Sequence, residues 1–247
     1  MSNEHHTVLV DRYQRAATTQ ANANSYKGHA IHALPGLHDF LADKVVGHCE
    51  QGSSVLDLAA GSGAMSLRLQ DLGFKVTATD YVSENFKLES VPFIQADLNG
   101  NFASAYPHQF DAVVASEIIE HLENPRHFAR EIFKLLKPGG RLIVSTPNVE
   151  NAGAKASFIR SGHFLWFDEQ DYEGQGHITP LTQWQLTRSF SEAGLRFLWQ
   201  GSFGEGASRL GGSPRLRVIA HLIKLLASID QALSREIYVA VLERPST

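Results

Sequence analysis

Short apolar runs alternate with segments of helical periodicity from residue 51 onward. The runs lie at residues 54–58, 75–79, 91–95, 110–115 and 141–145. They are rich in Val, Ile, Leu or Phe at consecutive positions, which is typical of strands covered on both faces. Strands separated by helices predict βαβ units, and therefore an α/β fold with a parallel sheet.

The residues before the first strand have a polar, helical pattern. Leu37, Phe40, Leu41 and Val45 follow the spacing of one helical face and predict an amphipathic helix over 36–46. A further helix between two strands has clear start and stop signals. Asn124 is a good N-cap and Pro125 suits the first helical position, and the apolar face extends to Leu136. The Pro-Gly-Gly sequence at 138–140 ends this helix after Lys137 in its last turn.

The chain beyond residue 145 is less regular. Residues 146–176 are rich in Asn, Gly, Ser and aromatic side chains and predict a long loop, which in a compact domain is usually functional. The later segments predict a helix at 182–193, a strand at 196–200, a mobile Gly/Ser-rich stretch at 201–212, a helix at 214–233 and a strand at 236–242.

The composition excludes several classes of protein. A single cysteine, Cys49, rules out a disulfide framework and a Cys-rich zinc site. The formal net charge of −4, without any basic run, disfavours a nucleic-acid partner. The N-terminus has no signal-peptide pattern, and no apolar stretch reaches the ~18 residues of a membrane span. We therefore expect a cytoplasmic protein with no transmembrane segment.

The strongest chemical signal follows the first strand. Asp57 ends the apolar run, and small residues with Gly61 and Gly63 lead into the next helix. Small residues let a backbone approach a ligand closely, and the N–H groups of a helix N-terminus favour acceptor groups. The nicotinamide fingerprint requires a third glycine where this chain has Ser66. An acid at Asp57 suits the cationic end of a ligand.

Residues 57–63 resemble motif I of class I S-adenosylmethionine-dependent methyltransferases, with Ala59 at a position where the family has glycine. The resemblance extends over residues 50–195. It implies that Asp80 accepts both ribose hydroxyls, that Tyr81 packs on the adenine, and that Asp97, followed by Leu98, accepts the adenine amino group. Ser116 at the end of the fourth strand matches the motif beside the methyl group. The cofactor-binding set is thus Asp57, Ala59, Gly61, Gly63, Asp80, Tyr81, Asp97, Leu98 and Ser116.

The resemblance also implies the architecture and the reaction. We expect a Rossmann-like doubly wound sheet, mostly parallel with an antiparallel last strand and with helices on both faces. A single domain over 1–247 would comprise an N-terminal helical cap (1–50), a cofactor-binding half (51–145), a lid or substrate loop (146–180) and a C-terminal half (181–247). S-adenosylmethionine would be the cofactor and S-adenosylhomocysteine the product. The acceptor would be a small molecule methylated at a hydroxyl group.

Two segments are candidates for the acceptor chemistry. The stretch 117–125 resembles ubiquinone-biosynthesis O-methyltransferases, and in a helix Glu117, Glu120 and His121 would share one face. His121 could act as a base tuned by Glu117, and the three groups could hold a divalent cation, as the same spacing does in small-RNA 2′-O-methyltransferases. The alternative is that they only order a turn, so we expect no metal.

His177 is the second candidate, at the junction between the long loop and the next helix. It could deprotonate a hydroxyl group or merely hold the loop closed. The loop aromatics Trp166, Phe167 and Tyr172 could stack on a flat acceptor or form ordinary lid packing.

The helix at 214–233 departs from the minimal fold. Its polar stripe of Arg217, His221, Lys224 and Ser228 could contact a membrane surface or a second subunit, or the helix could simply cover the sheet. Three rival functions stay open at this point. They are an NAD-dependent oxidoreductase, a non-methylating interaction or regulatory protein of the same fold, and an RNA methyltransferase.

Overall fold

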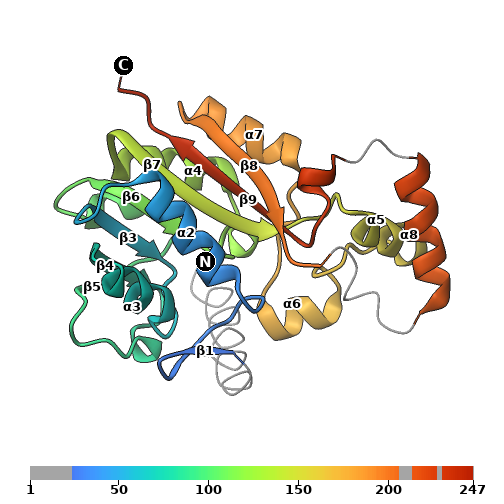
Figure 1. The fold of residues 1–247 in the computed structure, drawn as a ribbon, viewed down its shortest axis with the longest axis horizontal. Coiled ribbons are helices and arrows are strands. Elements are labelled where there is room, and N and C mark those ends of the chain that lie inside the picture. Colours follow the sequence, from blue (N-terminus) through green and yellow to red (C-terminus); the bar gives the residue numbers. More distant parts are fainter. Residues whose placement is uncertain (1–23, 206–212, 227–229, 247) are drawn as a thin grey trace, which may run out of the picture.

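The computed structural model describes residues 24–205, 213–226 and 230–246. Its centre is a seven-stranded sheet of order β5-β4-β3-β6-β7-β9-β8 (Figure 1). The strands are β3 (Ser54–Leu58), β4 (Lys75–Asp80), β5 (Phe93–Gln95), β6 (Phe110–Ala115), β7 (Leu136–Pro147), β8 (Arg196–Phe203) and β9 (Ile237–Glu243). The pairs from β5 to β7 are parallel, and β9 runs antiparallel to both β7 and β8. The expected α/β fold, mostly parallel with an antiparallel last strand, is confirmed.

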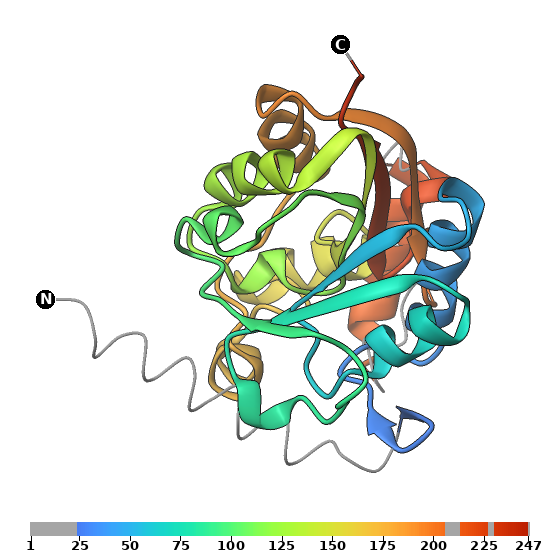
Figure 2. The same cartoon turned by 90° about the vertical axis from the view of Figure 1, so that its left-hand side faces the viewer.

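Helices cover both faces of the sheet, as the two views in Figures 1 and 2 agree. The helices are α2 (Leu37–His48), α3 (Ala64–Asp71), α4 (Pro125–Leu135), α5 (Ala152–Ser161), α6 (Glu169–Gln175), α7 (Gln183–Glu192) and α8 (Pro214–Leu226). Short 3-10 turns occur at Ser83–Asn85, Phe102–Ala105, Ile119–His121 and Gln231–Leu233.

Strand β3 shows how the sequence builds two cores. Successive side chains of a strand point to opposite faces. Val55 therefore packs with Leu41 and Met65 from α2 and α3, whereas Leu56 packs with Phe128 and other side chains from α4 and α7. Both sets are buried, which explains why the strands are apolar at consecutive positions.

Several predicted boundaries are confirmed locally. The Asn124 side chain accepts a hydrogen bond from His127 N, and Pro125 occupies the first turn of α4. Thr182 caps α7 through a reciprocal capping box with Gln185. The predicted end of α4 after Lys137 is wrong, because the helix stops at Leu135. Lys137 instead lies in β7, where its Nζ pairs with the Asp111 carboxylate at 2.8 Å.

Two predictions of local structure are wrong. The segment before α2 is not wholly helical, because β1 (Ser25–Tyr26) and β2 (His29–Ala30) form a hairpin with Lys27 and Gly28 at φ 47° and 88°. Positive φ at both central positions is the pattern of a type I′ turn, which closes two-residue hairpins. Residues 1–23 of the expected helical cap lie outside the described residues.

The expected loop at 146–176 contains α5 and α6. Their buried or capping residues are small or polar, which hides the helical pattern: α5 buries Ala152, Gly153, Ala154 and Ala156, and α6 begins with a capping box between Asp168 and Asp171. In the Gly/Ser-rich segment, residues 201–203 belong to β8, and 206–212 lie outside the described residues. Residues 227–229 of the predicted last helix, including Ser228, also lie outside them.

Candidate functional site

A cavity of about 270 Å³ lies at the carboxyl ends of β3 and β6. The chain leaves β3 toward β4 on one side and later returns to β6 on the other, so this is the switch point at which open α/β sheets bind ligands. The predicted residues Asp57, Ala59, Gly61, Ser116, Glu117, His121 and His177 all line this cavity. The fold therefore joins the Gly-rich turn to both candidate segments for acceptor chemistry.

The turn between β3 and α3 has a left-handed backbone. Ala59, Gly61 and Gly63 have φ of 67°, 53° and 92°. A side chain at Gly63 would approach Leu88 to 2.8 Å, so this position also needs the absence of a Cβ. Ala59 adopts the conformation that favours glycine, which gives a backbone reason for the glycine of the resembling motif. Ala59 lines the cavity, so its Cβ takes space there that a glycine would leave to a ligand.

Asp57 is buried beneath this turn. Its carboxylate accepts a 2.5 Å hydrogen bond from Ser66 Oγ, the residue at the position where a nicotinamide motif has glycine. Burial raises the pKa of Asp57 to about 7, the Ser66 hydrogen bond opposes the rise, and the Asp80 charge adds to it. A buried carboxylate without a cationic partner is costly. The site thus favours a ligand that brings positive charge.

Asp80 ties the end of β4 to the Gly-rich turn. Its two carboxylate oxygens accept hydrogen bonds from Gly61 N at 2.8 Å and Val82 N at 3.0 Å. Burial raises its pKa. Each carboxylate oxygen has two lone pairs, so both retain capacity for a ligand hydroxyl group. Asp80 is not part of the cavity wall, in contrast to Asp57.

The remaining predicted cofactor residues also lie outside the cavity wall. Tyr81 is half-exposed after β4, and Leu98 is buried after β5. The Asp97 carboxylate accepts a hydrogen bond from Asn99 N at 2.9 Å and thereby shapes the turn in which it lies. The structure brings together the residues around Asp57 and Ser116, and it leaves Gly63, Asp80, Tyr81, Asp97 and Leu98 beyond the cavity wall.

The acceptor side begins at Glu117, directly after β6. Glu117 has a φ of 50°, and residues Ile119–His121 form a short 3-10 turn. The prediction that Glu117, Glu120 and His121 share one face of a helix is therefore wrong. Ser145 Oγ accepts a hydrogen bond from Glu117 N at 3.1 Å, but Glu117 Oε1 is buried without a hydrogen-bond partner among the described residues. Burial raises the pKa of Glu117 to about 7.

Glu120 is a second buried carboxyl beside it. Thr146 Oγ1 donates a 2.9 Å hydrogen bond to Glu120 Oε2, whereas Oε1 has no hydrogen-bond partner in the described part of the chain. Burial and the negative charge of Glu117 raise the pKa of Glu120 well above its ordinary value. Two carboxyls are therefore held in a buried space that provides few donors.

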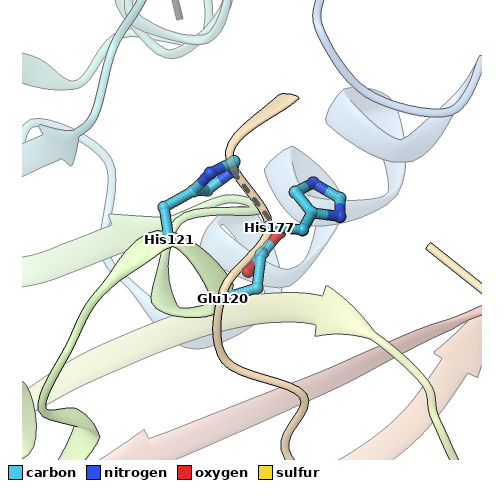
Figure 3. Close-up of side chains that lie close together, drawn as sticks. All are labelled: Glu120, His121 and His177. Atoms are coloured by element: carbon cyan, nitrogen blue, oxygen red, sulfur yellow. Dashed lines mark ion pairs between the residues drawn. The ribbon is translucent and has the colours of Figure 1, made fainter. Parts of the chain in front are cut away.

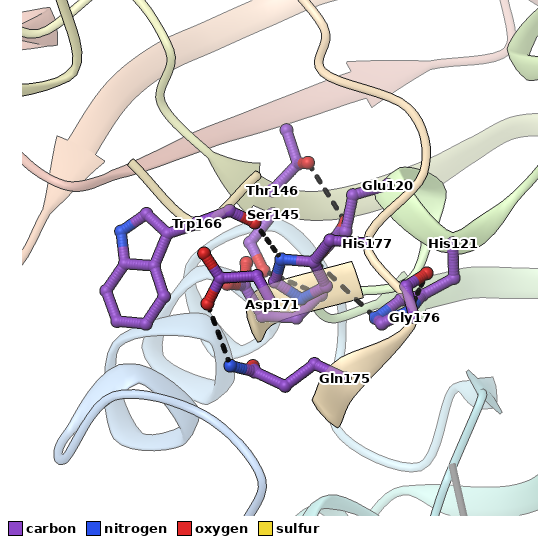
Figure 4. A network of polar contacts seen from close by, with 10 residues as sticks. Glu120, His121, Ser145, Thr146, Trp166, Asp171, Gln175, Gly176 and His177 are labelled. Atoms are coloured by element: carbon purple, nitrogen blue, oxygen red, sulfur yellow. Dashed lines mark hydrogen bonds and ion pairs between the residues drawn. The ribbon is translucent and has the colours of Figure 1, made fainter. Parts of the chain in front are cut away.

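His121 and His177 face each other edge to face, with ring centroids 4.8 Å apart (Figure 4). The Nδ1 of His121 lies 3.1 Å from Gly176 O, and the Nδ1 of His177 lies 2.6 Å from Trp166 O. A carbonyl oxygen only accepts, so each Nδ1 must carry the proton and each neutral ring presents Nε2 as an acceptor. Burial lowers the pKa of His121 to about 3, and His177 adds to this effect.

Glu120, His121 and His177 offer ligand-capable atoms within 4.8 Å of one another (Figure 3). Glu120 Oε1 lies 4.0 Å from His121 Nε2. Nitrogen and carboxylate ligands of this kind suit divalent transition metals. The sequence indicated a candidate metal-binding group of Glu117, Glu120 and His121. In the structure, His177 takes the place of Glu117 in this group.

Sequence reasoning missed other residues of the cavity wall, among them His32, His38 and Gln175. His38 Nδ1 is buried with no hydrogen-bond partner among the described residues, and burial lowers its pKa to about 4. These residues carry no recognisable motif. His38 reaches the cavity because the other side of α2 packs on the sheet, and helical periodicity marks only that packed side.

Comparisons with known proteins agree with the geometry. Residues 26–200 match the family model described as a methyltransferase domain. Ubiquinone biosynthesis O-methyltransferases are relatives of the chain: that of Caulobacter vibrioides is 30% identical over 66% of this chain and 66% of its own length, and that of Xanthomonas campestris 33% identical over 60% and 63%. The alignments thus span slightly less than two thirds of these relatives.

Solved structures share the fold at low sequence identity. The [4+2]-cyclase SpnF is 18% identical, with a TM-score of 0.61 over 98% of this chain and 96% of its own. The N-methyltransferase NodS from Bradyrhizobium japonicum is 15% identical, with a TM-score of 0.52 over 85% and 94%. These similarities concern the fold alone, because proteins named for different reactions share it.

Proposed function

This chain belongs to the methyltransferase-domain family, and we propose that it transfers the methyl group of S-adenosylmethionine to a hydroxyl group of a small molecule. The observation that carries the proposal is that one cavity joins the Gly-rich turn at Asp57 to Glu117, His121 and His177. S-adenosylhomocysteine would be the product. The O-methyltransferase relatives support a hydroxyl acceptor.

The residues around the turn fit the cofactor. The backbone at Ala59 and Gly61 allows close approach, and Asp57 offers negative charge to the amino group of the cofactor. His38 Nδ1 has no hydrogen-bond partner among the described residues, and it can donate to an acceptor such as a carboxylate when it carries the proton of the neutral ring. Asp80 retains lone pairs for the ribose hydroxyl groups. Tyr81, Asp97 and Leu98 would surround the adenine beyond the wall of the present cavity, and Ser116 would lie beside the methyl group.

On the acceptor side, the protein has to orient a hydroxyl group and receive its proton. When bound, the cofactor supplies an electrophilic methyl group on a sulfonium that is its own leaving group. Glu117 Oε1 and the Nε2 atoms of His121 and His177 are acceptors at the cavity wall, so a substrate hydroxyl group can donate to them. Orientation of two reactants in this way can lower a barrier by roughly 7–11 kcal/mol.

A divalent cation is a second element that one observation favours. Glu120 Oε1 has no hydrogen-bond partner among the described residues, and Glu120 forms with His121 and His177 the cluster in Figure 3. A cation there would offset the cost of ionising the buried Glu120 carboxyl, and it would polarise a hydroxyl group of the acceptor. This proposal differs from the expectation of no metal, and it leaves Glu117 Oε1 to receive the proton.

The rival functions lose support to different degrees. The family model and the Ser66–Asp57 hydrogen bond oppose a nicotinamide-dependent oxidoreductase. A non-methylating role stays a rival, because Ala59 adds a methyl group where the resembling motif has glycine. The acidic charge balance disfavours an RNA acceptor. A cytoplasmic location stays a prediction, as does a homodimer or membrane-surface contact through residues 214–233.

Thermal unfolding with S-adenosylmethionine, S-adenosylhomocysteine and NAD tests the cofactor first. A ligand at ~100 times its Kd adds ~2.7 kcal/mol, which is a rise of roughly 5–10 °C for a chain of this size. We expect this rise with the two sulfur compounds and none with NAD. No rise with either sulfur compound would favour the non-methylating alternative.

Transfer of a labelled methyl group then tests the acceptor. Hydroxylated aromatic compounds would be compared with their amino analogues, with and without added Mn²⁺ or Zn²⁺. We expect transfer to the hydroxyl compounds, and a fall of ~10²-fold or more in kcat for Glu117→Gln with cofactor binding retained. Transfer to the amino analogues alone would overturn the proposed O-methylation.

A further inference from the structure

Helices α5 and α8 form a pair at one end of the molecule, away from the centre of the sheet (Figure 1). Ala152 and Ala156 of α5 pack against Ala220 of α8, with Leu216, Ile219 and Ile223 partly buried around them. The small side chains allow close approach of the two helices. This packing uses one face of α8 and leaves the rest of the helix surface toward solvent. The helix therefore does not cover the central sheet as the simplest interpretation assumed.

The solvent side of α8 carries an apolar stripe. Val218, Leu222, Leu225 and Leu226 are 59%, 50%, 69% and 86% exposed. Their spacing of four, seven and eight residues from Val218 places them on one helix face. Neighbouring α5 adds exposed Phe158 and Ile159. Isolated exposed apolar residues need no explanation, but a stripe of this kind marks an interaction surface.

A basic stripe runs beside the apolar one. At 100° per residue, Arg217, His221 and Lys224 lie between the apolar stripe and the face that packs on α5. Arg215 adds a further cation, and residues 213–226 contain no Asp or Glu. Helix α5 likewise contains Lys155 and Arg160 without an acidic residue. Helices α5 and α8 thus carry only basic charged residues, although the chain as a whole carries −4.

We propose that α8 docks the protein on an anionic lipid membrane surface. A helix with an apolar stripe and adjacent Lys and Arg lies in the plane of the interface, with the apolar side chains inserted and the cations at the headgroups. No helix in the described ranges is long and apolar enough to cross a membrane. This proposal does not depend on the methyltransferase activity.

Charge argues against a second copy of the chain as the occupant. A two-fold interface brings the same surface of both copies together. Helix α8 would then place its cations opposite identical cations, with no acidic residue of α8 to pair with them. An anionic lipid surface, in contrast, places negative charge opposite these cations of α8.

Flotation of the full chain with vesicles tests the proposal. We expect binding to vesicles of 70% phosphatidylcholine and 30% phosphatidylglycerol, much weaker binding to phosphatidylcholine alone, and a decrease with added salt. The double variant Arg217→Glu/Lys224→Glu should reduce the partition coefficient by about 30-fold or more, because each cation near an anionic surface contributes about a fivefold factor. Leu222→Asp/Leu225→Asp should reduce it at least as much.

Matched controls separate docking from folding and from general charge. Arg130→Glu and Val46→Asp change exposed residues of α4 and α2 and should bind as the wild type does. All variants should keep the wild-type unfolding temperature within a few degrees. Equal binding by the α8 variants and the wild type would overturn the proposal, as would a lack of binding to both kinds of vesicle. A stable dimer that Leu222→Asp/Leu225→Asp converts to monomer would also overturn it and assign the surface to a second copy.

Discussion

The hydroxyl group of Ser66 donates a 2.5 Å hydrogen bond to the carboxylate of Asp57, from the first turn of α3 back to the end of β3. Both residues are buried, so this contact joins the two arms of the Gly-rich turn. The hydroxyl group lowers the cost of the buried charge but does not neutralise it. The burial of the Asp57 carboxylate is therefore unfavourable until a cationic ligand binds beside it.

Asp57→Asn should stabilise the ligand-free protein and weaken cofactor binding. With a pKa of about 7 in the folded chain and 3.8 as the ordinary value, folded Asp57 holds a proton that the unfolded chain has released. Its contribution to stability therefore falls as the pH rises from about 4 to 7 and is constant above that. At pH 8 the variant should gain about 2 kcal/mol, or roughly 4–8 °C in Tm.

Thermal unfolding at pH 5 and pH 8 checks this prediction. The gain should be smaller at pH 5, and the rise in Tm with S-adenosylmethionine should be lost. Asp43→Asn, at an exposed position of α2, is the control and should change neither quantity. An equal gain at both pH values would contradict the ionisation of Asp57 as its cause.

Ala59→Gly should tighten cofactor binding at little cost in stability. Ala59 has a φ of 67°, so glycine relieves backbone strain of about 1 kcal/mol while it adds a similar entropy to the unfolded chain. It also removes a methyl group from the cavity wall. Calorimetric titration with S-adenosylhomocysteine should show a lower Kd. Ala60→Gly, at a neighbouring position without positive φ, should lower Tm instead, and an unchanged Kd for Ala59→Gly would show that its Cβ does not obstruct the ligand.

Glu120→Gln should distinguish the effect of the buried carboxyl on stability from its role as a metal ligand beside His121 and His177. Gln keeps the acceptor for Thr146 Oγ1 but removes a carboxylate whose ionisation burial opposes. Without metal, the variant should be as stable as the wild type or more so. Calorimetry with Mn²⁺ or Zn²⁺ should show binding to the wild type and a loss of at least tenfold in the variant. Equal metal affinity of both proteins would exclude Glu120 as a ligand.

Gly63→Ala should destabilise the protein by about 2–3 kcal/mol. Its φ of 92° disfavours any side chain, and the new Cβ would lie 2.8 Å from Leu88. Gly47→Ala is the matched control, because its Cβ would meet nothing within 4 Å in a regular helix. It should gain up to about 1 kcal/mol. Urea unfolding measures both, and equal effects would show that the Leu88 contact is easily relieved.

Much of the fold follows from the sequence because strands and capped helices are local. Strands β3 and β6 have the predicted boundaries, since small or polar residues flank both apolar runs. Asn124 and Thr182 begin their helices through hydrogen bonds to residues three positions away. Helices α5 and α6 were missed because small or polar residues form their buried face and caps, and a search for apolar periodicity does not register these.

The sequence by itself determined the Gly-rich turn and its neighbouring acids, because these residues are adjacent along the chain or end successive strands. Only the tertiary structure decided the acceptor side. His121 Nδ1 meets Gly176 O across 55 positions, and this contact brings His177 beside His121 and Glu120. Likewise, the packing of α2 on the sheet directs His38 to the cavity. Such contacts depend on how buried faces fit together in three dimensions, and no spacing along the chain encodes that fit.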